Sequence, residues 1–86
     1  MKLTETAFAE IAKSNGFDNY DIRFMVGEIF ENAEKVSLDL IIEKIMNDLQ
    51  NTLQSETHLK VSGDIGYIIR YLEKYKALIV ELENMC

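Results

Sequence analysis

The side chains that most often carry out chemistry in enzymes are scarce in this chain. It holds one histidine, His58, and one cysteine, Cys86, which is the last residue. Nucleophilic catalysis needs a base held against a nucleophile, and a zinc site needs three or four ligands, mostly nitrogen or sulfur. The carboxylates do not have the spacing of a calcium-binding loop. The sequence therefore predicts a protein without enzymatic activity, metal or cofactor.

Acidic side chains outnumber basic ones along the whole chain. Aspartate and glutamate total 15 and lysine and arginine total 9, for a formal net charge of −6. Proteins bind nucleic acid mainly by replacing phosphate counterions with Lys and Arg, so we expect no direct contact with nucleic acid. The acidic surface either serves solubility alone or docks on a basic partner.

One predicted surface combines aromatic and acidic side chains. Tyr20 and Phe24 are one helical turn apart, opposite the apolar stripe of their helix. The acidic residues around them are Asp21, Glu28 and Glu31. Aromatic rings supply apolar area that an interface buries, while carboxylates steer a basic partner toward it. We therefore predict a partner-binding face here; the alternative is that the last helix covers both rings and makes them part of the core.

The elements that must position these residues are predicted to be helices. Apolar residues recur at helical spacing in four segments, which are residues 5–14, 19–34, 38–53 and 64–84. The first three segments each follow a residue able to cap a helix, namely Thr4, Asp18 and Ser37. Each capping residue also stands between apolar side chains in the positions of a hydrophobic staple. These starts predict an all-α fold with three shorter helices and one long C-terminal helix, in a single domain over residues 1–86.

The apolar positions of the first three helices define the expected core. They are Phe8, Ile11 and Ala12; then Ile22, Met25, Val26, Ile29, Phe30 and Ala33; then Leu38, Ile41, Ile42, Ile45, Met46, Leu49 and Leu53. Gly16 is expected to end the first helix in a left-handed conformation. Gly27 lies inside the second helix at a cost of about 1 kcal/mol relative to alanine, which indicates either a closely packed neighbour or simple tolerance.

The last helix carries an unusually broad apolar face. Its expected packing row is Ile65, Ile68, Leu72, Tyr75, Ile79 and Leu82, spaced alternately by three and four residues. A second row beside it contains Tyr67, Tyr71 and Leu78. Either the helix lies in the cleft between the other helices, or this second row faces another chain. The sequence thus allows a monomer or a homodimer.

Residues 54–63 are the expected linker. Residues 57–61 alternate in polarity, but a lone strand without a partner is unstable, so we predict a loop. His58 then is an exposed linker residue. No segment has the length and apolarity of a membrane span, and the N-terminus lacks a basic segment followed by an apolar run, so we expect a cytoplasmic protein that does not bind membranes.

The first two helices also fit a helix-turn-helix. Apolar and turn residues occupy suitable positions at Ile11, Ala12, Gly16, Phe17, Ile22 and Met25. Asn15, however, stands where such motifs usually bury an apolar group. The second helix would also present Asp21 and Glu28 to the DNA, and carboxylates repel phosphates. A small DNA-binding regulator is therefore the alternative function, and a self-associating structural protein is a third.

The N-terminal segment 1–17 resembles the opening of small helical anti-CRISPR proteins that inhibit type II-C Cas9. The residues that carry the resemblance are Met1, Lys2, Thr4, Phe8, Ala9, Ile11, Ala12, Ser14 and Phe17. The resemblance implies a phage protein that binds a bacterial CRISPR-Cas effector, either Cas9 or a Cascade-type complex, and blocks nucleic-acid binding or cleavage. Such effectors hold guide and target in positively charged channels, which an acidic helical domain complements.

Overall fold

A computed structural model of the chain describes residues 1–55 and 65–85, of which a few side chains are left out. The elements, in chain order, are β1 (Lys2–Thr4), α1 (Glu5–Ser14), α2 (Asn19–Phe30), β2 (Lys35–Ser37), α3 (Leu38–Ser55) and α5 (Ile65–Asn84). This described part is mostly helical, which confirms the predicted fold class. The predictions for His58, residues 57–61 and the side chains of Ile65, Tyr67 and Ile68 lie outside the described residues.

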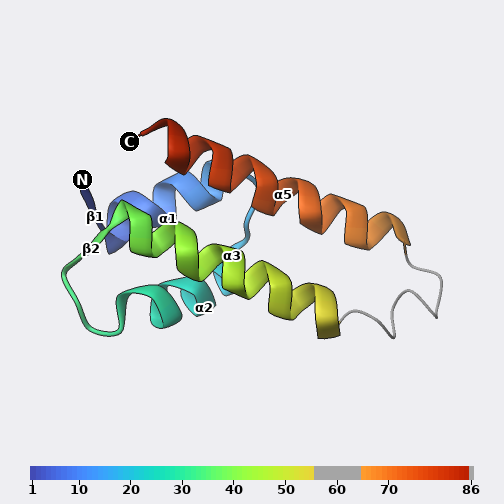
Figure 1. Cartoon of the computed structure of the whole chain (residues 1–86), viewed down its shortest axis with the longest axis horizontal. Coiled ribbons are helices and arrows are strands. Elements are labelled where there is room, and N and C mark those ends of the chain that lie inside the picture. The colour runs from blue at the N-terminus through green and yellow to red at the C-terminus, as the bar shows by residue number, and fades with distance from the viewer. Residues whose placement is uncertain (56–64, 86) are drawn as a thin grey trace.

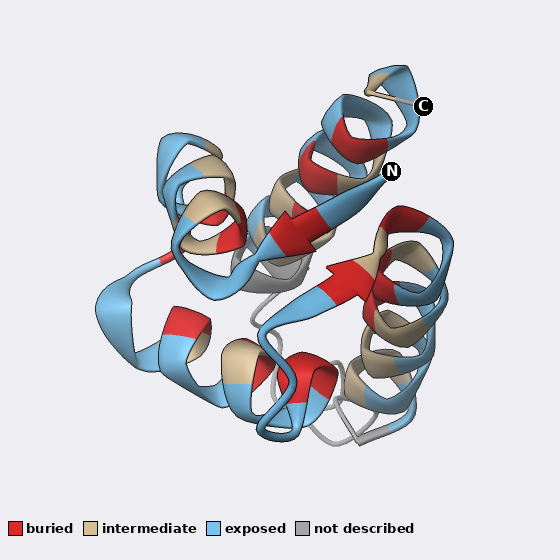
Figure 2. Cartoon of the chain, turned by 90° about the vertical axis from the view of Figure 1, so that its left-hand side faces the viewer, coloured by how far each residue is buried: buried red, intermediate tan, exposed pale blue. Residues whose placement is uncertain are grey.

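Two long helices form the main axis of the molecule. α3 and α5 lie side by side and run in opposite directions (Figure 1). α1 and α2 pack together at the end of this pair where both termini lie, and α2 also packs on α3. The short strands β1 and β2 lie at the same end, between the helices (Figure 2). The result is an elongated molecule measuring 40 × 24 × 21 Å.

The predicted helix starts are confirmed by their hydrogen bonds. Each capping side chain accepts a hydrogen bond from the backbone N–H three residues later. The distances are 3.2 Å at Thr4, 2.8 Å at Asp18 and 3.3 Å at Ser37. These bonds satisfy N–H groups that have no partner inside the helix, so each helix begins where its first residues are best capped.

The ends of α1 and α2 are set by left-handed residues. Gly16 has φ +94°, as predicted, and its N–H donates to the carbonyl of Lys13 at 3.1 Å. α2 ends at Phe30, so the prediction that it continues to residue 34 is wrong. Glu31 and Asn32 have φ 44° and 73°, and two such residues cannot continue a right-handed helix.

The two-stranded sheet was not predicted. β1 and β2 pair antiparallel, with Leu3 opposite Val36. These are the residues that precede the caps of α1 and α3, and both are buried. The similar triplets Lys-Leu-Thr and Lys-Val-Ser are the signal that points to this pair. A ribbon this short is unstable alone, so its two buried side chains must be held by the helical core.

The core contains apolar residues from every described element, and no polar or charged residue is buried among the described residues. Phe8, Ile41 and Leu82 are fully buried at its centre. The prediction of burial is wrong for two residues. Ala33 is exposed because α2 has ended before it, and Met46 is 51% exposed because it lies toward the outer side of α3.

The buried row of α5 is rotated from the predicted row. Leu72 and Ile79 are only half-buried, whereas Leu78, from the second row, is fully buried. The turn between α1 and α2 also contacts this helix, since the Phe17 ring meets the Tyr75 ring edge-on at 5.3 Å. α5 therefore packs on α3 and on this turn together.

Candidate functional site

The two aromatic rings of the predicted binding face are exposed. The exposed fraction is 80% for Tyr20 and 56% for Phe24. Both belong to α2, whose opposite face is buried through Ile22, Met25 and Ile29. The alternative interpretation, in which the last helix covers these rings, is therefore wrong. Two large apolar rings left in solvent on one helix face are typical of an interface.

The predicted acidic residues lie on the same helix as these rings or directly after it. Glu28 is exposed on α2, Asp21 is half-buried in the first turn of this helix, and Glu31 follows its end. Glu31 forms an ion pair with Lys44 of α3, with 3.6 Å between the charged atoms. Lys44 Nζ also donates to the carbonyl oxygen of Glu28 at 3.1 Å. Lys44 thus anchors the end of α2 to α3 and neutralises part of the charge at this end.

Negative charge is crowded at this face. The pKa of the Asp21 carboxyl is raised, first by burial and then by the nearby Asp18 and Asp48, while Lys74 opposes the rise. The pKa of Glu28 is also raised, first by burial and then by Asp48. Asp48 comes from α3 and was not predicted as part of the site. The acidic potential therefore extends from α2 onto α3.

A buried tyrosine holds Asp48 in place. The hydroxyl of Tyr75 donates to Asp48 Oδ2 at 2.9 Å. Burial, followed by this hydrogen bond, raises the pKa of Tyr75, so its hydroxyl stays protonated and remains a donor. Because Tyr75 is only 2% exposed, the hydrogen bond links the core of α5 to the acidic face.

An acidic groove lies beside the C-terminal part of α2. It has a volume of about 590 Å³ and runs between the start of α1 and the end of α2. Its acidic lining residues are Glu5, Glu31 and Glu34. Glu5 and Glu34 were missed by sequence reasoning because they belong to different segments, which only the pairing of β1 with β2 brings together. A groove with three carboxylates suits a lysine or arginine side chain of a partner.

Gly27 lines this groove on the exposed side of α2. A Cβ atom placed on Gly27 would meet no atom within 4 Å, so close packing by a neighbour does not explain the glycine. Within the described structure the glycine is simply tolerated in the helix. It leaves flat backbone without a side chain at the edge of the groove.

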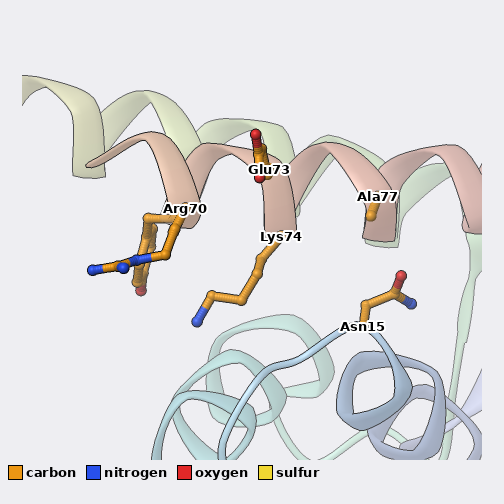
Figure 3. Close-up of a pocket in the computed structure, with 6 residues that line it drawn as sticks. Asn15, Arg70, Glu73, Lys74 and Ala77 are labelled. Atoms are coloured by element: carbon orange, nitrogen blue, oxygen red, sulfur yellow. The ribbon is translucent and has the colours of Figure 1, made fainter. Parts of the chain in front are cut away.

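A second groove lies between α5 and the turn that joins α1 to α2. Its volume is about 430 Å³, and Lys74 points from α5 toward the turn (Figure 3). Lys74 Nζ lies 5.5 Å from the centre of the Phe17 ring and 5.3 Å from that of Tyr71. These distances are those of cation–π contacts. The lysine therefore covers both rings from above.

The predicted self-association row is not available as a whole. Leu78 is fully buried in the core of its own chain, so the alternative in which it faces another chain is wrong. Tyr71 is half-buried and packs against the core beneath Lys74. The side chain of Tyr67 lies outside the described residues. The last helix thus uses Tyr71 and Leu78 to pack on its own chain.

The exposed face of α2 is poorly suited to DNA. Its one basic residue, Arg23, shares the helix with Asp21 and Glu28, and Asp48 adds a further carboxylate. Asn15 stands at the turn position where helix-turn-helix motifs usually bury an apolar side chain. Its side-chain amide instead donates a hydrogen bond to the carbonyl oxygen of Ile11 at 2.8 Å. The charges here would repel phosphates rather than bind them.

Residues 1–55 and 65–85 show no group of three or more His, Cys, Asp or Glu side chains placed to hold a metal ion. Within the same residues, no helix has both the length and the apolarity needed to cross a membrane. The chain matches no family model, curated protein or solved structure at a significant level.

Proposed function

We propose that the chain works by binding a basic surface of a partner protein through the exposed face of α2, without catalysis. The single observation that carries this proposal is the exposure of Tyr20 and Phe24 among carboxylates on one helix face. In this arrangement the rings become desolvated in the complex, and the carboxylates attract and orient a basic partner.

The electrostatics of the face support a binding role. The pKa values of Asp21 and Glu28 are raised, first by burial and then by nearby carboxylates that include Asp48 in both cases. Carboxylates placed close together destabilise the folded state, and arrangements that cost stability occur most often at functional sites. The acidic groove beside Gly27 offers the partner a place for a basic side chain.

The proposed partner is a bacterial CRISPR effector, Cas9 or a Cascade-type complex. This part of the proposal rests on the resemblance of residues 1–17 to anti-CRISPR proteins and on charge complementarity. Effectors of this class bind nucleic acid in positively charged channels. An acidic helical domain seated in such a channel excludes guide or target by occupying the same basic side chains, so one inhibitor per effector suffices.

The test is a binding titration against purified type II-C Cas9 and a Cascade-type complex, together with a DNA-cleavage assay. The triple variant D21K/E28K/E31K is expected to bind at least about tenfold more weakly, with a smaller dependence on salt. The control variant E10K/E43K/E83K changes the net charge equally but on exposed residues away from this face. It should bind almost as well as the unaltered protein.

The aromatic part of the face is tested by Y20A/F24A. Because both rings are exposed, their removal should leave the fold intact and weaken binding about 100-fold or more if they are interface anchors. M46A removes a comparably exposed apolar side chain elsewhere and serves as the control. Equal affinity of all variants would exclude this face, and a shift of operator DNA instead of an effector would favour the DNA-binding alternative.

A further inference from the structure

A second exposed surface runs along the outer side of α5. Its apolar members, Ile69 and Val80, are 49% and 46% exposed. Glu73 and Lys76 lie between them and are exposed as well. Lys74, the next residue after Glu73, points toward the turn between α1 and α2, and Glu73 lies at the edge of the groove between that turn and α5 (Figure 3). We call these four residues the α5 stripe.

The α5 stripe has the spacing of a helix-packing row. Its members are separated by four, three and four residues, which keeps them on one side of a helix as in a coiled-coil seam. The buried row of α5 lies on another side of the same helix and is already used by α3 and by the turn at Phe17. The stripe is therefore a packing surface that the described residues of its own chain leave exposed.

The order of residues along the stripe is self-complementary. Its midpoint lies between residues 74 and 75, with Glu73 and Lys76 at equal distances on either side, and Ile69 and Val80 likewise. A second α5 laid antiparallel across this midpoint places Glu73 opposite Lys76 of the other copy, twice. It also places Ile69 opposite Val80 twice. Both ionic contacts are attractive and both apolar contacts are matched, as a two-fold interface requires.

From this complementarity we infer that the α5 stripe binds a second copy of the chain, through an antiparallel α5 pair about a two-fold axis. The contact involves one helix from each copy, so the dimer is weak, with a dissociation constant between about 10 μM and 1 mM. This surface is distinct from the exposed face of α2, and the inference does not depend on the proposed CRISPR partner.

Sedimentation equilibrium of the purified chain at concentrations up to about 2 mM tests the inference, using the single variants E73K and K76E. Each variant places like charges opposite each other twice, so each should raise the dissociation constant about tenfold or more. In an equal mixture of the two, a mixed dimer places two lysines of the E73K copy opposite two glutamates of the K76E copy. The mixture should therefore dimerise at least as well as the unaltered chain.

The mixture distinguishes contacts between two chains from contacts within one helix. Each variant has lost any attraction between positions 73 and 76 of its own helix, so dimerisation that returns in the mixture must come from contacts between the two chains. The matched controls E10K and K13E make the same charge changes at exposed positions of α1 and should not alter association. An unaltered chain that stays monomeric up to about 2 mM would overturn the inference. So would single variants that dimerise as well as the unaltered chain, or a mixture that does not.

Discussion

Replacing Gly27 with alanine tests the structure of α2 directly. A glycine inside a helix is less stable than alanine by about 0.5–1 kcal/mol, because the unfolded chain has more conformations to lose. At Gly27 an added methyl group meets no atom within 4 Å, and the residue lies within the helix. The whole gain should therefore appear as stability, a rise of about 2–8 °C in Tm for a domain of this size.

The same substitution at Gly16 should have the opposite sign. Gly16 has φ +94°, and an added Cβ would lie 3.3 Å from Cδ of Lys74. Left-handed backbone costs a residue with a Cβ about 1–2 kcal/mol, so G16A should be destabilised by at least that amount. Both variants add the same methyl group to the chain. The opposite signs of their effects on stability therefore arise from the local backbone conformation and surroundings of each glycine.

Urea denaturation followed by far-UV circular dichroism measures both variants against the unaltered chain. The denaturant midpoint should shift while the slope stays constant, because the surface exposed on unfolding is nearly unchanged. A loss of stability in G27A would refute the helical, unobstructed environment of this residue. If G27A is more stable yet binds its partner more weakly, the flat backbone at this position belongs to the binding surface.

Three further predictions follow from single side chains. Y75F removes the hydrogen bond to Asp48 and should reduce the free energy of unfolding by about 1–2 kcal/mol in the same denaturation assay; an unchanged value would contradict the contact. E28Q removes a carboxyl whose pKa is raised above its ordinary value of 4.5 in the fold. Ionisation of Glu28 therefore opposes folding, so E28Q should be the more stable protein above the raised pKa of the folded state. Its advantage should shrink as the pH falls through that raised pKa and be gone below 4.5; a pH-independent difference would refute the assignment. Finally, F8A should cost about 3–5 kcal/mol because Phe8 is fully buried, whereas the half-exposed M46A should cost less than about 1 kcal/mol.

Local patterns in the sequence determined where the helices begin. Thr4, Asp18 and Ser37 cap helices through hydrogen bonds that span only three residues, so no distant contact is needed to place them. Helical periodicity also places Tyr20 and Phe24 on the side of α2 opposite its apolar stripe, although only the tertiary structure shows that the last helix leaves them exposed. The helix starts and this placement depend on neighbours close in the chain, and the sequence contains all of them.

Contacts between distant segments decided the rest. Leu3 and Val36 pair only because the chain returns to its N-terminus, and this return ends α2 at Phe30. The same return brings Glu5 to the acidic groove. The broad apolar face of α5 allows several packing rows, and the row that the fold buries contains Leu78 together with Tyr75, which meets Phe17 of the distant turn. The hydrophobic effect is non-directional, so each of these rows would gain a similar free energy from burial. Which row is buried therefore depends on the surfaces that the assembled fold places opposite α5.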